Sequence, residues 1–293
     1  MSETRRLSGL DYLETGSSLL QRVRAAHPTR GLFEAADLQW WWRNPRPTDE
    51  IGQLFWFNEA GRPVAAAILT DWTDWVSLTP IFLPDVDPTF VADVVARGLA
   101  HAAEQGIEAV ELEVDRSDDV MRTVLFAHRF ELRDEAFLAE SWLAAESRPP
   151  VSPLHDGYRI ADRTDTGGLS HHMTSKRRNH SDVEDRLRQT PLYRPDLDLG
   201  VYDRDDVAAG YGLFWFDPVT MTGLVEPMRT EEEHQRRGLA RHIITTGVDR
   251  LARAGAERVK VCFETDNPGA RDLYLSVGFE PVKETDLFAG PTS

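Results

Sequence analysis

Apolar residues recur at helical spacing in the second half of the chain, and this pattern predicts an amphipathic helix. The stripe consists of Leu239, Ile243, Ile244, Val248 and Leu251. Gly255 follows in the position typical of a helix C-terminus, so the predicted helix runs from Leu239 to Ala254. A second helix is predicted after Asn267, which is suited to be its N-cap because Pro268 stands at the first helical position.

Short apolar or alternating runs around these helices predict β-strands. In the second half the runs are YRIAD (158–162), DLDLGVYD (196–203), VAAGYGLFWF (207–216), LVEPMR (224–229), RVKVCF (258–263) and FEPVKETDLF (279–288). Further helical material is expected from about Gly168 to Arg188. The alternation of strands and helices indicates an α/β sheet with helices on its faces.

The first half of the chain repeats this pattern. Residues 252–263, moved back by 149 positions, fall on a helix end, a glycine and a strand that reaches Val114. The same offset takes residues 278–288 to 129–139, and an offset of 147 takes LVEP (224–227) to SLTP (77–80). The two halves are therefore interpreted as duplicated domains.

A break in the pattern separates the halves. The stretch AESRPPVSPLHDGY (145–158) contains three prolines and small polar residues, which is typical of a linker. We therefore expect one domain over 1–147 and another over 156–293, each near the commonest domain size.

Composition narrows the classes of function. Lys and Arg number 33 against 49 Asp and Glu, which gives a formal net charge of -16. Such a surface repels nucleic acid and anionic membranes and attracts cationic ligands, so neither nucleic acid nor a membrane is expected as a partner. The single cysteine, Cys262, excludes an intramolecular disulfide, and neither a signal peptide nor an apolar run of about 20 residues is visible. These features favour a cytoplasmic protein.

The two halves differ where the helix of residues 239–254 begins. At the offset of 149, QRRGLA (235–240) falls on VDPTFV (86–91), which has no glycine and no cation. A glycine turn at a helix N-terminus presents unpaired N–H groups at the positive end of the helix dipole, which suits an anion such as a pyrophosphate. Gly238 would let the backbone approach the phosphates, and Arg236 or Arg237 would add charge. The alternative is an ordinary helix start with solvated arginines.

The motif Q-x-x-G-x-A at 235–240, followed by a helix, a strand and NPGARDLYLSVGF at 267–279, resembles the Gcn5-related N-acetyltransferase (GNAT) superfamily. The resemblance is specific over 213–288 and only architectural for the first half, an arrangement similar to tandem acetyltransferases of the mycothiol synthase type. It implies two tandem GNAT-like domains, each a mixed, mostly antiparallel sheet flanked by helices. The first of these is expected to be degenerate and to lack the pyrophosphate turn. Glu232 stands where many members have proline, which affects the turn more than the chemistry.

The resemblance also implies acetyl-CoA, or another acyl-CoA, as co-substrate and no metal. The pantetheine would pair with the backbone of 228–230 like an added strand, and the pyrophosphate would meet the amides of about 236–240. The residues expected to bind acetyl-CoA are Met228, Arg229, Thr230, Gln235, Arg236, Arg237, Gly238, Leu239, Ala240 and Asn267. For Asn267, the role of N-cap is an equal alternative.

Two side chains are candidates for the chemistry. The resemblance implies that Tyr274 is the general acid that protonates the departing CoA sulfur; alternatively, it is a core residue of its helix. Glu226 precedes Pro227 on the central strand, where a carboxylate is either paired or acts as a base. We expect the amine to attack the thioester directly, without an acyl-enzyme, because no activated nucleophile is visible.

Other side chains are open to simpler interpretations. Trp40, Trp41 and Trp42 with Trp72 and Trp75 form either a pocket wall between the halves or part of a core or domain interface. The stretch SKRRNH (175–180) either reaches a CoA phosphate or forms a solvated helix face. His171 and His172 lack spacing partners for a metal site, and Cys262 lies in an apolar strand, unlike an exposed catalytic thiol.

The predicted function is transfer of an acetyl (acyl) group from acetyl-CoA to a primary amine. The acidic composition favours a cationic small molecule as the acceptor. The alternatives are acetylation of a protein N-terminus or lysine, and a CoA-binding regulator without turnover. A monomer or a homodimer is expected.

Overall fold

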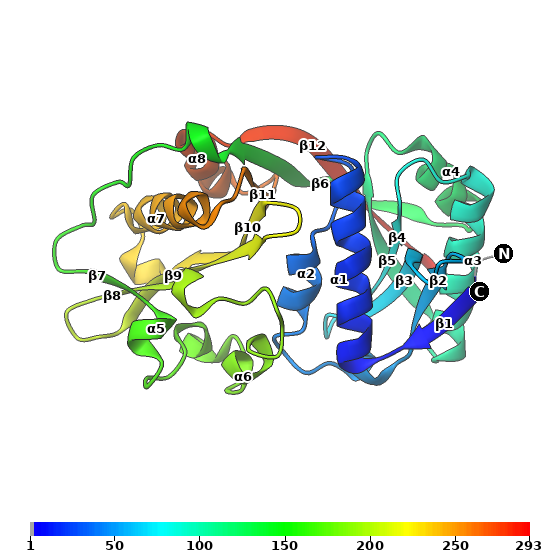
Figure 1. The fold of residues 1–293 in the computed structure, drawn as a ribbon, viewed down its shortest axis with the longest axis horizontal. Coiled ribbons are helices and arrows are strands. Elements are labelled where there is room, and N and C mark those ends of the chain that lie inside the picture. The colour runs from blue at the N-terminus through cyan, green and yellow to red at the C-terminus, as the bar shows by residue number, and fades with distance from the viewer. Residues whose placement is uncertain (1–2) are drawn as a thin grey trace. The chain divides into compact units, whose positions relative to one another are not determined.

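The computed structural model describes residues 3–293, which divide into two compact units (Figure 1). The first unit comprises the chain up to Leu38, Pro45–Leu138 and Lys283–Ser293; the second comprises Gln39–Asn44 and Ala139–Val282. Each unit contains a mixed, mostly antiparallel sheet flanked by helices, so the predicted fold class is confirmed.

The sheet of the first unit has the strand order β1-β2-β3-β4-β5-β12. Its strands are β1 (Glu3–Leu7), β2 (Gln53–Phe57), β3 (Pro63–Asp71), β4 (Val76–Phe82), β5 (Ala109–Asp115) and β12 (Glu280–Pro291), the last from Lys283 onward. The helices are α1 (Gly9–Ala26), α2 (Ala35–Trp41, which continues into the second unit), η1 (Pro47–Glu50), α3 (Pro88–Glu104) and α4 (Asp119–Ala127). The pair β4 and β5 is parallel, whereas β1–β2, β2–β3, β3–β4 and β5–β12 are antiparallel.

The sheet of the second unit has the order β6-β11-β10-β9-β8-β7. Its strands are β6 (Glu131–Ala144, from Ala139 onward), β7 (Arg159–Asp162), β8 (Asp198–Tyr202), β9 (Ala208–Asp217), β10 (Thr222–Thr230) and β11 (Arg258–Glu264). The helical segments are η2 (Ala145–Ser147), α5 (Arg163–Thr166), η3 (His172–Arg177), α6 (Val183–Leu187), η4 (Pro195–Leu197), η5 (Glu232–His234), α7 (Leu239–Ala254) and α8 (Pro268–Val277). Here the parallel pair is β10 and β11.

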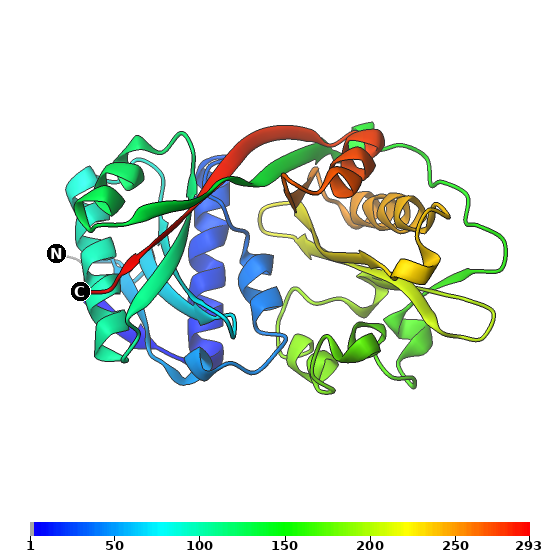
Figure 2. The ribbon, with the colours of Figure 1, turned by 180° about the vertical axis from the view of Figure 1, so that it is seen from behind.

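The last strand of each sequence half extends into the other unit. Strand β12 pairs with β5 from Thr285 opposite Asp115 to Pro291 opposite Ala109 (Figure 2), and β6 neighbours β11. The units therefore differ from the expected ranges 1–147 and 156–293, because residues 139–147 join the second unit and 283–293 join the first. The physical reason is that both halves carry equivalent strands, and either sheet can satisfy their backbone hydrogen-bonding groups.

A buried ion pair accompanies this exchange in the second unit. The Lys260 ammonium on β11 lies 3.0 Å from the Glu140 carboxylate on β6, and both side chains are inaccessible to solvent. Trp142 Nε1–H donates a 2.7 Å hydrogen bond to the same carboxylate. Removing one partner of such a pair typically costs about 3–5 kcal/mol, because the other charge is then left buried and unpaired, so the two residues depend on β6 lying beside β11.

The duplication expected from the sequence is present in the local structure of both units. Strands β5 and β11 begin 149 residues apart, each after a glycine in the left-handed conformation, Gly106 (φ 77°) and Gly255 (φ 108°). The residues after α4 and α8 likewise correspond: Arg129 has φ 64° and Gly278 has φ 104°. One fold has thus been kept by two diverged sequences.

Helix α7 has the bounds that the sequence predicts and packs on β9 and β10 (Figure 1). Its apolar stripe is buried, with Ile243, Ile244, Val248 and Leu251 inaccessible to solvent. Gly247 lets the helix approach the sheet closely, since a Cβ there would lie 2.1 Å from the Phe214 ring. This packing fixes the start of α7 relative to the end of β10.

The two groups of tryptophans belong to different units. Trp40, Trp41 and Trp42 are part of the second unit, where Trp42 Nε1–H donates to Gln189 at 3.1 Å and Arg186 lies over the Trp42 ring. Trp72 and Trp75 belong to the first unit and stack on each other at 5.7 Å. The segment 39–44 is therefore packed as core of the second unit. Within residues 3–293, no helix has the length and apolar character needed to cross a membrane.

Candidate active site

Strand β10 contains an irregularity at Glu226 and Pro227. Its antiparallel register with β9 shifts between Val225, opposite Phe214, and Met228, opposite Gly212. The parallel pairing with β11 covers Thr222–Val225 and ends at the same point. Beyond Glu226 the two parallel strands separate, and this opening is where the sequence predicts the pantetheine.

A buried tryptophan holds the irregular segment in place. Trp215 on β9 is 1% exposed, and its Nε1–H donates a 2.7 Å hydrogen bond to the carbonyl oxygen of Glu226. The indole thus pairs a carbonyl group at the point where the sheet register shifts. Trp215 positions the Glu226 backbone, a role that the sequence pattern alone did not indicate.

The turn between β10 and α7 exposes backbone N–H groups. Arg236 and Gly238 both have left-handed backbone angles, φ 62° and φ 76°, and Gly238 is the N-cap of α7. A Cβ at Gly238 would meet nothing within 4 Å, so the space beside the turn is open. The first turn of α7 holds no acidic residue, and its first backbone bond runs from His242 N–H to the Gly238 carbonyl. The amides before His242 therefore face outward at the positive end of the helix, an arrangement suited to an anion.

Hydrogen bonds fix the side chains of this turn. The Arg237 guanidinium donates to Tyr158 Oη at 2.6 Å and to the Glu233 carbonyl at 3.2 Å, while Tyr158 Oη lies 2.9 Å from His234 Nδ1. The Gln235 amide donates to the Thr230 carbonyl at 3.3 Å and so joins the turn to the end of β10. Tyr158, which sequence reasoning missed, therefore orients one of the two arginines beside the turn.

Tyr274 on α8 is buried against aromatic rings. Its ring stacks on Phe263 at 5.5 Å and meets Phe279 edge-on at 5.9 Å. Burial raises the pKa of the phenol, and the charges of Glu226 and Cys262 raise it further. The phenol is consequently protonated and is a weaker acid than a free tyrosine. The structure places Tyr274 in the core, where the charge of Glu226 affects its pKa, and its role as general acid stays a prediction.

The other expected acetyl-CoA contacts differ in their surroundings. Asn267 caps α8, where its side chain accepts a 3.0 Å hydrogen bond from Ala270 N–H. Leu239 is buried and Met228 packs against the same core, so these two offer mainly backbone groups. Arg229 directs its Nε to within 3.7 Å of the Glu231 carboxylate.

Cys262 on β11 is half-buried rather than fully enclosed in its strand.

The basic stretch 175–180 is neither a solvated helix face nor a set of free cations. The helical material expected over 168–188 is two short segments, η3 and α6, and Lys176 and Arg177 have positive φ angles. Arg178 pairs with the buried carboxylate of Glu231, and Lys176 lies 3.1 Å from Glu231 and 3.0 Å from Glu233. These contacts anchor the segment beside the end of β10.

A buried histidine pair lies outside the predicted site. His171 Nε2 and His172 Nε2 lie 2.9 Å and 2.8 Å from the two oxygens of Asp198, which also accepts from Tyr193 Oη at 2.9 Å. The three donor atoms lie within 4.8 Å of one another, close enough to hold a metal ion. They also form a satisfied hydrogen-bond network by themselves. The sequence spacing did not indicate this group, because Asp198 lies on β8, 26 residues after His172.

Part of the chain matches a known family model. Residues 166–279 match the model of the Acetyltransferase (GNAT) family, a range that contains β10, the turn, α7, β11 and α8. Comparison with curated protein sequences gives no significant match.

Solved structures share the fold over the whole chain. A tandem GNAT protein from the clavulanic acid biosynthesis pathway superposes with a TM-score of 0.72 and 14% identity, covering 100% of this chain and 99% of that one. A GCN5-related N-acetyltransferase from Sphaerobacter thermophilus gives 0.65 and 13%, covering 99% and 96%. A third, from Kribbella flavida, gives 0.56 and 16%, covering 92% and 95%. At these identities the likeness concerns the fold.

Proposed function

We propose that this chain is an acyl-CoA-dependent N-acyltransferase of the acetyltransferase (GNAT) family, whose model matches residues 166–279, and that it moves an acetyl group from acetyl-CoA to the primary amine of a small cationic molecule. One observation carries the proposal: β10 and β11 separate at Glu226, and β10 then leads to the open, glycine-capped start of α7. This arrangement offers an unpaired strand edge for an extended pantetheine and backbone amides for a pyrophosphate.

Direct transfer requires a proton acceptor and a proton donor. An alkyl amine with a pKa near 10.4 is only about one part in 10³ neutral at pH 7, so deprotonation costs on the order of 4–5 kcal/mol. Glu226 stands where the strands separate and takes that proton, directly or through water. The amine nitrogen then attacks the thioester carbonyl carbon, the C–S bond breaks, and Tyr274 donates its phenolic proton to the sulfur. The nitrogen loses its second proton as the amide forms, and this proton restores the Tyr274 phenol through water, while Glu226 releases the first proton to solvent. The products are the N-acetyl amine and CoA with a free thiol.

The charge of the chain supports a cationic acceptor. The net charge of -16 raises the local concentration of cations and lowers that of anions around the molecule. Charged groups near the site are mostly paired with each other, as Lys176 and Arg178 are with Glu231. Steering by the whole acidic surface therefore favours an amine substrate.

The test is release of free thiol from acetyl-CoA with a panel of amines, together with a reaction that lacks amine to measure hydrolysis. We expect release with small primary amines that carry further positive charge. Release only with peptides would replace this acceptor class by protein N-termini or lysines. Tight CoA binding without release for any amine or peptide would contradict catalysis and indicate a CoA-binding regulator.

A further inference from the structure

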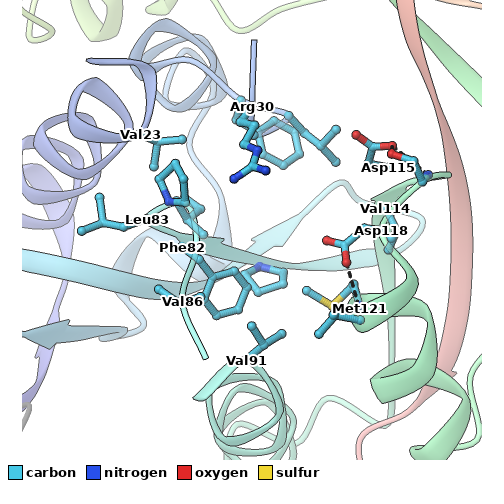
Figure 3. A pocket seen from close by; sticks show the side chains of 18 of the residues that line it. Val23, Arg30, Phe82, Leu83, Val86, Val91, Val114, Asp115, Asp118 and Met121 are labelled. Carbon is cyan, nitrogen blue, oxygen red and sulfur yellow. Dashed lines mark hydrogen bonds between the residues drawn. The ribbon is translucent and has the colours of Figure 1, made fainter. Parts of the chain in front are cut away.

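The first unit contains a cavity of about 560 Å³. It lies between the ends of β4 and β5, the starts of α3 and α4, and the connection after α1 (Figure 3). Apolar side chains form most of the inner wall seen in the figure, among them Val23, Phe82, Val86, Val91, Val114 and Met121. A concave site of this size with apolar walls and a few polar groups is typical of small-molecule binding.

The cavity lies where β4 and β5 separate, as the opening in the second unit lies where β10 and β11 separate. Parallel pairing between β4 and β5 is confined to Ser77 opposite Glu111, and beyond it Phe82 and Val114 line the cavity from the two strands. At the sequence offsets of 147 and 149, this pair corresponds to Leu224 and Lys260, which pair in the second unit. The cavity is thus the first unit's counterpart of the expected pantetheine site.

The start of α3 does not offer a site for phosphates. Its N-cap is Asp87, whose carboxylate accepts from Thr89 N–H at 2.8 Å and from the Thr89 hydroxyl at 2.6 Å. Pro88 at the first helical position has no N–H to donate. A carboxylate therefore occupies the place where an anion would bind, and it repels the phosphates of CoA.

The charged lining of the cavity is predominantly negative. It contains two cations, Arg30 and Lys283, and five carboxylates, Asp85, Glu113, Asp115, Asp118 and Asp119. Both cations already have partners: Arg30 pairs with Asp85, and Lys283 donates to the Thr29 carbonyl at 2.6 Å and lies 3.6 Å from Asp115.

Asp118 remains as a negative group at the cavity. Figure 3 shows its carboxylate on the cavity side of the α4 start, with Met121 and Val91 nearby. One oxygen accepts from Met121 N–H at 2.9 Å, and within residues 3–293 neither Asp118 nor Asp119 has a cationic partner. Asp118 is exposed, so a bound ammonium group would form a solvent-screened ion pair with its carboxylate, while the apolar body of the ligand would cover the valine and methionine side chains.

We propose that the first unit binds a small organic cation with an apolar body in this cavity, and that it does not bind CoA there. The ammonium group pairs with Asp118, and the body lies against Phe82, Val86 and Met121. This site is independent of acetyl transfer, since all its residues belong to the first unit.

The test uses three probes of one shape on the full chain: 2-phenylethylamine, 2-phenylethanol and 3-phenylpropanoate, measured by calorimetry or ligand-observed NMR. For a cation of about nine heavy atoms we expect a dissociation constant of roughly 0.1–1 mM. The alcohol should bind more weakly and the anion should not bind. An excess of CoA should leave amine binding unchanged. Equal binding of all three probes, no binding of the amine up to 10 times that range (about 10 mM), or displacement of the amine by CoA would overturn the proposal.

Two variants locate the site. Asp118→Asn keeps the α4 N-cap, because asparagine caps as well as aspartate, and should weaken amine binding about fivefold through loss of one exposed charge pair. Val86→Trp should abolish amine binding by filling the cavity. Asp93→Asn makes the same charge change on the exposed side of α3 and should leave binding unchanged. Unaltered amine binding in Asp118→Asn and Val86→Trp, with unfolding midpoints near that of the parent chain, would refute this location.

Discussion

Asp118 and Asn267 hold the same position in the two copies of the fold, and each accepts a hydrogen bond from the amide three residues later, at 2.9 Å and 3.0 Å. Their capping function is therefore shared, while only Asp118 is charged. The helix starts that precede them differ in the same sense: α3 is capped by Asp87 and α7 by the open Gly238. The two copies therefore share their packing but differ in charge, since a carboxylate caps α3 and no acidic residue stands in the first turn of α7.

The chain should bind one CoA, and Gly238→Asp should weaken that binding at least about 100-fold. The substitution places a carboxylate beside the amides expected to hold the pyrophosphate, and like charges in such contact cost several kcal/mol. Calorimetry with CoA gives both the stoichiometry and the affinity. Gly61→Asp is the matched control, since Gly61 also has a positive φ (70°) and open space beside it but lies in the turn between β2 and β3. Two sites per chain, or unchanged affinity in Gly238→Asp, would contradict this assignment.

Tyr274→Phe should lower kcat by about 10- to 100-fold and leave CoA affinity unchanged. The phenol is a weak acid in this setting, because burial raises its pKa above the ordinary value of 10.0 and Glu226 adds to the effect. A thiolate with a pKa near 8.5 is already a fair leaving group, so the general acid supplies only part of the rate. Steady-state kinetics and CoA titration measure the two effects.

Stability provides the control for Tyr274. Phenylalanine keeps the ring contacts with Phe263 and Phe279, so the free energy of unfolding should change by less than about 1.5 kcal/mol. If turnover in Tyr274→Phe equals that of the parent chain, Tyr274 is a packing residue without a chemical role.

Several features of the fold could be predicted from the sequence because local signals specify them. Helix α7 has the expected bounds, since Gly238 and Gly255 mark its ends and its apolar stripe is continuous. The exchange of β6 and β12 could not be predicted, because equivalent strands satisfy either sheet and the choice depends on contacts such as Lys260 with Glu140. Long-range choices of this kind leave no periodic trace in the sequence.

The candidate site was predictable to a similar extent. The turn at 235–238 carries a motif, so its position could be expected, whereas the support of Arg237 by Tyr158 links residues 79 positions apart. The Trp215 hydrogen bond to the Glu226 carbonyl depends on a register shift that the hydrophobic pattern does not contain. Sequence reasoning located the backbone groups of the site and missed the side chains that hold them.

Acid should destabilise the second unit through the histidine pair. Burial lowers the pKa of His172 from 6.5, although Asp198 opposes the shift. Below about pH 6.5 the unfolded chain therefore takes up a proton that the native state does not bind, and stability falls as pH falls, by at most about 1.4 kcal/mol per pH unit for this group.

Asp198 extends this dependence to lower pH. Burial alone would raise its pKa, but the electrostatic interaction with His172, together with hydrogen bonds from His171 and His172, outweighs burial and holds the pKa below 3.8. Its contribution is present above about pH 4 and is lost as pH falls further. Urea unfolding at pH 8, 7, 6 and 5 measures the histidine part of the curve. His172→Gln should flatten the slope between pH 6.5 and 5, while the same change at exposed His180 should not; equal slopes in both variants would exclude His172 as the source.

Glu226→Gln should lower kcat at pH 7 by about 10² or more. Glu226 lies where β10 and β11 separate, and its backbone carbonyl accepts a hydrogen bond from Trp215. The charge of its carboxylate raises the pKa of Tyr274. Glutamine keeps the size of the side chain and removes its ability to take a proton from the ammonium form of the substrate. Because the fraction of free amine rises tenfold per pH unit below the amine pKa of about 10.4, raising the pH should partly restore the rate of the variant.

Rates measured from pH 7 to 9.5 with acetyl-CoA and a responsive amine provide this profile. Glu232→Gln, an exposed carboxylate in the turn after β10, controls for loss of one negative charge near the site. A rate near that of the parent chain at pH 7 in Glu226→Gln would assign proton removal to a water chain, and Glu226 would then be a structural residue at the strand separation.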